Sequence, residues 1–356
     1  MNVLAKYQLY DDPLSLFSKM IDDIMAAQHS IYLQTFRFAN DFIGKRFRTA
    51  LNRKIKDGVK IVVLIDSWGT GVNESFFREM IDLGAKVKFF QKIKFSFDIF
   101  SRNHRRNHRK LLIIDNNISY IGSLNITTYC LNWRESALRI TGNIANEFVK
   151  IIEDDFKMSN KVYQNKRVST EKISKNGINI IRDVPGTFQQ PVRQAYIDAI
   201  NSAKEEIIIE TPYFLPASLL RKSIYKAAER GVKIKILMPR HSDVMLFDIL
   251  RNRYLGKYHK KNISILLYMP DNLHAKVFLV DNKYFLTGSS NFDYRSMQFM
   301  HEINIDGEQK EIVSLLKLHL DETIRDCEPF DYEDWKKRSV FLKINEALFV
   351  PFRHLF

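Results

Sequence analysis

Two short histidine motifs of the same form carry the residues in this chain that are best suited to chemistry. Each has a histidine, a lysine two positions later, an aspartate seven positions after the histidine, and then Gly-Ser-x-Asn. Imidazole, with an unperturbed pKa of about 6.5, can act as nucleophile, acid or base, and lysine can bind an anion. The pattern therefore predicts chemistry on a phosphate group. Its members are His108, Lys110, Asp115, Ser123 and Asn125 in the first copy, and His274, Lys276, Asp281, Ser289 and Asn291 in the second.

The spacing within each motif predicts which side chains share a pocket. Alternate side chains of a strand lie on one face, so a His and a Lys two residues apart point together. Asp115 and Asp281 follow at an odd interval and each precedes an Asn, so the residues alone place both at turns outside the pocket. The apolar stretches 118–121 and 284–287 predict returning strands that bring Gly-Ser-x-Asn beside the His and Lys. Glycine there permits close backbone approach, while Ser and Asn supply hydrogen bonds.

A third histidine, His104, lacks a lysine, an aspartate and Gly-Ser at these spacings, so we assign it to a basic approach surface. The mixture of cations and aromatic rings just before the first motif suits an anionic lipid surface, and it also suits stacked bases of a single nucleic-acid strand. Its members are Lys92, Lys94, Phe95, Phe97, Phe100, Arg102, Arg105 and Arg106.

The whole chain is a duplicated unit. Residues 21–35 match residues 197–211 at six positions, and Gly58-Val-Lys-Ile matches Gly231-Val-Lys-Ile in the same order relative to the histidine motifs. Such self-similarity fixes architecture more firmly than local propensity does. We predict a first unit over 1–160, a polar, Lys-rich linker over 161–178, a second unit over 179–330, and a basic amphipathic tail over 331–356.

The elements expected within each unit alternate between helix and strand. Asp12-Pro13 supplies a helix cap and a first-turn proline before apolar residues at helical spacing. A strand follows at 31–36, a helix at 43–56 and a buried, β-branched strand at 59–65. This alternation predicts an α/β fold, in which two similar units each have a mixed sheet flanked by helices.

Composition narrows the class of protein and its surroundings. The formal net charge of +14 favours phosphate-bearing partners, and Cys130 and Cys327 are too few for a disulfide framework or a structural zinc site. The N-terminus lacks the apolar core of a signal peptide, and no apolar run approaches the roughly 20 residues of a membrane span. We therefore expect a cytoplasmic protein that associates peripherally with the inner membrane.

The paired motifs resemble the phospholipase D superfamily, and the resemblance covers nearly the whole chain. It implies two similar α/β units with both motifs lining one pocket between them, so that no dimer is required. One histidine would form a phosphohistidine and the other would serve as acid and base, with the choice between His108 and His274 open and His108 favoured.

The same resemblance assigns roles to the other motif residues. The lysines and asparagines would bind phosphate oxygens without a metal or other cofactor, and the two aspartates would belong with the catalytic groups. Glu135 and Glu302 are placed to orient the histidines, although a generic surface role for Glu135 stays open.

Within the superfamily, bacterial cardiolipin synthases are the most similar group. The resemblance rests on Asp66-Ser-Trp68-Gly69, Arg106-Asn-His108-Arg-Lys110, Thr211-Pro-Tyr-Phe214, residues 231–239 and residues 288–296. It implies a phosphatidyltransferase that forms cardiolipin from phosphatidylglycerol, with anionic phospholipid and a membrane surface as partners. The alternatives are a phospholipase D hydrolase, a nuclease that binds nucleic acid, and an inactive membrane-binding scaffold. The N-terminal transmembrane hairpin of the long bacterial members is not found in this sequence.

The C-terminal tail combines apolar bulk with basic residues over 340–356. This composition is typical of an interfacial helix that embeds in lipid headgroups. Packing of the tail on the body of the protein is the alternative, and we favour the membrane.

Overall fold

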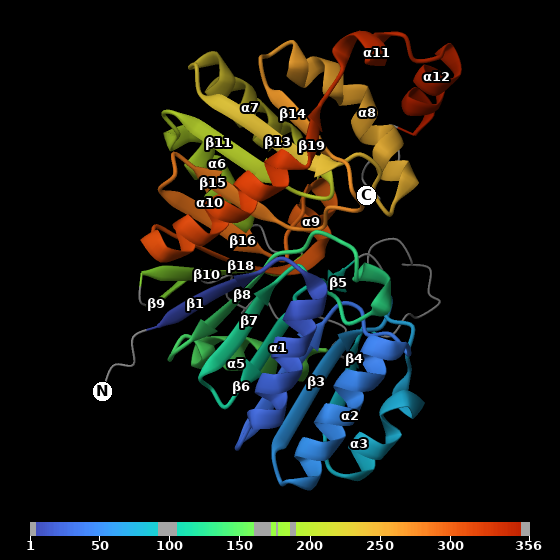
Figure 1. Cartoon of the computed structure of the whole chain (residues 1–356), viewed down its shortest axis with the longest axis vertical. Helices are drawn as coiled ribbons and strands as arrows, with labels where there is room; N and C mark the ends of the chain where they lie inside the picture. Colours follow the sequence, from blue (N-terminus) through green and yellow to red (C-terminus); the bar gives the residue numbers. More distant parts are fainter. Residues whose placement is uncertain (1–4, 92–104, 160–171, 176, 186–189, 350–356) are drawn as a thin grey trace.

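The computed structural model describes residues 5–91, 105–159, 172–175, 177–185 and 190–349 (Figure 1). The first unit has a seven-stranded mixed sheet of order β1-β8-β7-β6-β2-β3-β4. Strands β2, β3 and β4 are parallel, and the remaining neighbours are antiparallel. The strands are β1 (Lys6–Tyr10), β2 (Ser30–Thr35), β3 (Lys60–Asp66), β4 (Lys86–Phe90), β6 (Leu111–Ile114), β7 (Ile118–Gly122) and β8 (Ala137–Thr141), and the helices are α1 (Pro13–Ala26), α2 (Phe42–Lys56), α3 (Arg78–Asp82) and α5 (Ala145–Met158).

The second unit repeats this topology strand for strand. Its sheet runs β10-β18-β16-β15-β11-β13-β14 and adds one edge strand on each side, β9 (Lys172–Lys175) and β19 (Cys327–Pro329). The predicted α/β fold of two similar units is therefore confirmed. The matching strands are β10 (Ile178–Asp183), β11 (Glu206–Glu210), β13 (Lys233–Pro239), β14 (Ser264–Tyr268), β15 (Val277–Val280), β16 (Tyr284–Gly288) and β18 (Met300–Gly307), with helices α6 (Pro191–Ser202), α7 (Ser218–Glu229), α8 (Met245–His259), α9 (Tyr294–Phe299) and α10 (Lys310–Arg325).

Three large hydrophobic cores in the described residues hold these layers together, beside a small fourth one around Leu215, Phe247 and Leu250. Helices α1 and α2 cover the outer face of the first sheet, and α6 and α7 cover the corresponding face of the second. The third core contains α5, α10 and the inner faces of both sheets, so it joins the two units. The first sheet and the second consequently form one continuous body, with the lower and upper halves of Figure 1 stacked along its long axis.

Local sequence signals explain why the elements begin where they do. The Asp12 carboxylate accepts a hydrogen bond from Ser15 N at 2.7 Å, which caps α1, and Pro13 occupies the first turn. Strand β3 is buried at every residue after its first, as expected for a strand covered on both faces. Both predictions are confirmed.

The predicted limits of the linker need correction. Strands β9 and β10 form an antiparallel hairpin on the edge of the second sheet, so residues 172–175 and Ile178 belong to the second unit and not to a linker. Residues 160–171 lie outside the described residues. In the tail, α11 (Tyr332–Lys336) and α12 (Val340–Leu348) pack on α8, where Trp335 Nε1 donates to Asn252 O at 2.9 Å.

A buried ion network links the two units beside the first histidine motif. Asp155 of α5 pairs with the guanidinium of Arg109, and its other oxygen lies 2.8 Å from Arg182 of β10. Arg109 also donates to the carbonyls of Asp183 (2.7 Å) and Glu302 (3.0 Å). The two cations outweigh the effect of burial and hold the pKa of Asp155 well below its usual value. One carboxylate thus neutralises two buried cations from different units.

Replacing that carboxylate should destabilise the whole protein. We expect Asp155→Asn to lower the free energy of unfolding by about 3–5 kcal/mol at neutral pH, because two buried cations lose their counter-charge. The matched control is Asp154→Asn, whose exposed carboxylate lies 3.4 Å from Arg182 and should contribute less than about 1 kcal/mol. Denaturant unfolding followed by circular dichroism measures both. Equal losses for the two variants would contradict the role given to Asp155.

Candidate active site

The two histidine motifs meet where the two units contact each other. Each His-x-Lys segment lies immediately before a strand, β6 in the first unit and β15 in the second. His108, Lys110, His274 and Lys276 are all buried. His108 Nδ1 of the first motif lies 3.0 Å from the Ser289 carbonyl of the second, which places the two motifs at one site.

Each histidine is oriented by a carboxylate from the other unit. His108 Nδ1 lies 3.0 Å from Glu302 Oε1, and His274 Nδ1 lies 2.9 Å from Glu135 Oε1. Both glutamates are fully buried. Because a carboxylate accepts the Nδ1 proton, Nε2 of each ring is left to face the reacting group. Because each unit supplies the glutamate that orients the histidine of the other, the site depends on both units.

Backbone contacts also join each histidine to the unit that supplies its glutamate. The His108 N–H donates to the carbonyl of His301 at 3.0 Å, and the His274 N–H donates to the carbonyl of Arg134 at 2.7 Å. These carbonyls belong to the residues immediately before Glu302 and Glu135. Strand β5 (Arg106–Asn107) also pairs with β18 of the second unit, while Arg134 forms an isolated bridge to Leu273. Each histidine is therefore tied to its partner carboxylate by main chain as well as by side chain.

The serines of the Gly-Ser-x-Asn sequences hold the glutamates. Ser123 donates to Glu135 and Ser289 donates to Glu302, both through short hydrogen bonds. A β-carbon on Gly122 would lie 2.2 Å from the Ser136 carbonyl, and one on Gly288 would lie 2.4 Å from the Ile303 carbonyl. Only glycine permits this close approach of neighbouring strands. The approach brings the two serines next to the carboxylates, and the serines thereby orient the carboxylates that orient the histidines.

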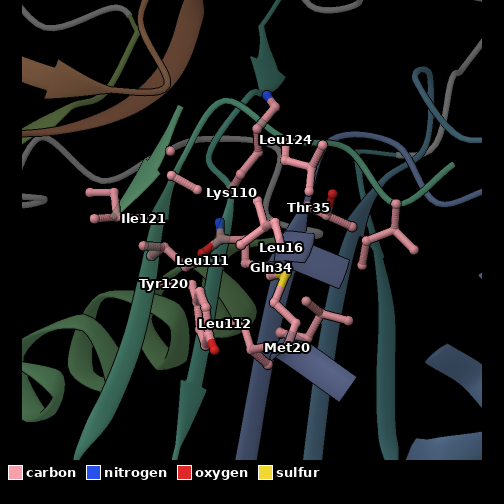
Figure 2. Close-up of a pocket in the computed structure, with 14 residues that line it drawn as sticks. Leu16, Met20, Gln34, Thr35, Lys110, Leu111, Leu112, Tyr120, Ile121 and Leu124 are labelled. Carbon is pink, nitrogen blue, oxygen red and sulfur yellow. The ribbon is translucent and has the colours of Figure 1, made fainter. Parts of the chain in front are cut away.

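The lysines and asparagines remain available for an anion. Lys110 Nζ and Lys276 Nζ each donate to the carbonyl of their own histidine, at 2.7 and 2.6 Å, which leaves further N–H donors on both. Figure 2 shows the Lys110 stem along the lining of a small, largely apolar cavity, with its nitrogen directed away from Leu112 and Met20. The Oδ1 atoms of Asn125 and Asn291 are buried and have no hydrogen-bond partner among the described residues. An amide oxygen can only accept a hydrogen bond, so these atoms suit a hydroxyl of a ligand, while the Nδ2 groups of the two side chains would donate to a phosphate.

Asp115 and Asp281 lie elsewhere, at the far ends of β6 and β15. Both have positive φ angles, 51° and 52°, in the turns that lead to the returning strands. Asp115 accepts hydrogen bonds from the backbone N–H groups of residues 28, 29 and 30, and Asp281 does so from residues 204, 205 and 206. The expectation that they join the catalytic groups is corrected, because their carboxylates close the helix-to-strand connections before β2 and β11.

The two histidine and glutamate pairs differ electrostatically. Burial and the positive charges of Lys110 and Lys276 hold the pKa of His108 well below its usual value. Burial also lowers the pKa of His274, but the Glu135 carboxylate opposes that shift. Burial raises the pKa of Glu302 to about 8, whereas at Glu135 the charges of His274 and Lys276 outweigh burial and leave its pKa below the usual value. The near-symmetric fold thus holds an unsymmetrical pair of imidazoles.

Two further features near the site were not found from the sequence. Asp66, at the end of β3, accepts from Asn107 N at 2.8 Å and lies 3.6 Å from Arg106, so it anchors the chain that enters the first motif. Arg106 is 1% exposed, so its place in the predicted basic surface is corrected. His104 and the rest of that surface up to Arg102 lie outside the described residues. The Asp66-Ser-Trp-Gly sequence was a usable signal for this anchor.

The described residues form neither a cluster of metal ligands nor a membrane-spanning helix. They contain no group of three or more His, Cys, Asp or Glu side chains that could hold a metal ion. None of the helices in the described ranges has both the length and the apolar content needed to cross a bilayer.

The buried lysines predict the pH dependence of the site. Burial and mutual repulsion lower the pKa of Lys110 to about 7, and burial lowers that of Lys276 to about 8. Each lysine binds an anion only while protonated, so kcat/KM for a soluble aryl phosphodiester should fall as pH rises from about 7 to 9, well below the range of an ordinary lysine. Circular dichroism over the same range controls for unfolding. A kcat/KM that stays constant to about pH 10 would contradict this account.

Comparison with known proteins places this geometry in a family. A family model described as "Cardiolipin synthase, PLD-like domain" matches residues 20–159 and 196–324. A cardiolipin synthase of Clostridium perfringens is 30% identical over 356 residues, which cover 96% of this chain and 75% of the relative. One from Listeria welshimeri is 30% identical over 354 residues, with 96% and 73% covered.

Solved structures show the same fold. Phosphatidylserine synthase of Haemophilus influenzae superposes with a TM-score of 0.79 at 15% identity, covering 98% of this chain and 93% of that one. Polyphosphate kinase of Porphyromonas gingivalis gives 0.62 at 12% identity, covering 98% and 53%. The family model spans both halves of the duplicated chain, including both histidine motifs, and the protein therefore belongs to the phospholipase D-like (PLD-like) family.

Proposed function

We propose that this protein is a phosphatidyltransferase of the cardiolipin synthase type, which forms cardiolipin from phosphatidylglycerol or a related donor. The observation that carries the proposal is the meeting of two carboxylate-oriented histidines at one buried, lysine-rich site. The similarity to cardiolipin synthases over 96% of the chain supports phospholipid as the substrate class. A single chain supplies both motifs, so the site needs no second copy.

In the proposed first step, Nε2 of His108 attacks the phosphorus of the donor lipid. The new P–N bond replaces the bond to the headgroup oxygen, and His274 gives that oxygen a proton as the alcohol leaves. The strongly depressed pKa of His108 supports its role as nucleophile, because it keeps the imidazole neutral. The Glu135 carboxylate opposes the lowering of the His274 pKa, so of the two imidazoles His274 more readily carries the proton that a general acid requires.

In the proposed second step, a lipid hydroxyl replaces the histidine. His274 takes the proton from this hydroxyl, the oxygen bonds to phosphorus, and the P–N bond breaks. Lys110, Lys276 and the Nδ2 groups of the two asparagines would donate to the non-bridging oxygens in both steps. Water in place of the lipid alcohol would give hydrolysis through the same intermediate.

The proposed reaction is tested with purified protein, phosphatidylglycerol vesicles and no added metal. We expect cardiolipin and glycerol in equal amounts by mass spectrometry, and a loss of at least about 1000-fold in the His108→Ala and His274→Ala variants. Circular dichroism shows whether those variants keep the fold. Phosphatidic acid as the sole lipid product would make the protein a hydrolase. Cleavage of single-stranded DNA with untouched lipid would make it a nuclease.

We further propose that α12 attaches the protein to an anionic membrane. The helix packs on α8 through its acidic residue: Glu346 is 3% exposed and accepts from Asn252 Nδ2 at 2.6 Å and Arg338 Nε at 2.9 Å. Its apolar side chains point the other way, and Phe341 and Val340 are each 71% exposed. A helix that buries its acid and exposes its apolar residues, next to the cationic Lys336 and Lys343, suits the headgroup region of an anionic bilayer.

This attachment predicts the effect of removing the apolar face. Phe341→Ser combined with Ile344→Ser should reduce binding to phosphatidylglycerol-containing vesicles by about ten- to a hundredfold in a sedimentation assay, because each side chain loses its apolar transfer energy. Cleavage of a soluble phosphodiester should persist. Leu318→Ser is the matched control, since Leu318 is a 63% exposed apolar residue on α10. Unchanged vesicle binding by the double variant would return α12 to a packing role alone.

A further inference from the structure

A guanidinium near His108 has no carboxylate in direct contact among the residues that the structure describes. Arg295 lies in the first turn of α9 and is partly exposed. Its Nε atom is buried and has no hydrogen-bond partner, and none of the ion pairs formed among the described residues includes it. An unpaired cation in a partly buried position is costly unless a ligand satisfies it.

The two carboxylates whose charges act on Arg295 form hydrogen bonds with other residues. Asp293 caps α9 by accepting from Ser296 N at 2.7 Å. Asp66 accepts from Trp68 N and Asn107 N, both at 2.8 Å, and faces Arg106. Both carboxylates act on the pKa of Arg295 through space without forming an ion pair with it. Within the described ranges, neither carboxylate therefore takes up the guanidinium donors of Arg295.

Arg295 lies at the edge of the catalytic site. Its charge contributes to the low pKa of His108. The indole of Trp68, 48% exposed, faces both Arg106 at 5.2 Å and Arg295 at 6.0 Å. The reacting phosphate already has two lysines and two asparagines, so Arg295 is a cation beyond that set.

We propose that Arg295 forms a second phosphate subsite, which binds the phosphodiester of the acceptor lipid. The inference rests on the proposed transfer reaction. In phosphatidylglycerol the hydroxyl that attacks is separated from its own phosphate by the glycerol carbons, so that phosphate lies outside the reacting site while the hydroxyl enters it. A guanidinium suits such a diester because it presents several donors in a fixed plane. Arg295 would thus favour a phosphate-bearing alcohol over water.

Competition between two acceptors tests the subsite. Phosphatidylglycerol vesicles with added ethanol offer the phosphohistidine a phosphate-bearing alcohol and a phosphate-free one. We expect Arg295→Gln to lower the ratio of cardiolipin to phosphatidylethanol about tenfold, and Arg295→Lys to restore part of it. Arg53→Gln, which removes an exposed charge on α2, is the matched control and should keep the wild-type ratio.

The outcomes separate this inference from the proposed function. If Arg295→Gln loses both products equally, or leaves their ratio unchanged, the subsite is wrong. Cardiolipin formation by the wild type would still support the proposed transferase in that case. Phosphatidylethanol without any cardiolipin from the wild type would overturn both. Inorganic phosphate tests the other source of the same chemistry: if it inhibits cardiolipin formation selectively in the wild type and Arg295→Gln leaves the ratio unchanged, the subsite binds free phosphate and not the acceptor.

Discussion

The exchange of carboxylates between the two units is the constraint on which the site depends. Glu302 of the second unit holds His108 of the first, and Glu135 of the first holds His274 of the second. Neither half of the duplicated chain therefore contains both a histidine and the glutamate that orients it. Three further features hold the two units in a fixed relative position. They are the backbone bridges beside these contacts, the third hydrophobic core and the Asp155 network.

The same constraint explains the electrostatics of the site. Two lysines and two histidines from different units are brought together in a buried space, where their charges repel and burial disfavours them. A phosphodiester anion supplies the charge that this arrangement lacks. Preorganised cations of this kind need no rearrangement when negative charge builds up in the transition state, which is the largest contribution that many enzymes make to catalysis.

Much of this organisation could be predicted from the sequence, because it depends on periodicity and repetition. The duplicated units, the capped first helix and the buried third strand follow from such patterns. Asp115 shows both the strength and the limit of the method: its odd spacing placed it at a turn, while family resemblance grouped it with the catalytic residues, and its three backbone hydrogen bonds support the turn. The lack of an ion-pair partner for Arg295 among the described residues, and the packing of α12 through its buried acidic residue, depend on contacts between segments distant in sequence. Local sequence patterns do not predict such contacts.

The central claim is that two carboxylate-oriented histidines share the chemistry, and trapping the covalent intermediate tests it most directly. An aryl phosphodiester such as bis(p-nitrophenyl) phosphate has a leaving group that needs no proton, so in His274→Ala the first step should proceed while the second loses its base. Intact mass spectrometry followed by peptide mapping should then find the aryl phosphoryl group on His108, and none should form in His108→Ala. A label on His274, or equally fast turnover of both variants without any phosphohistidine, would contradict the account.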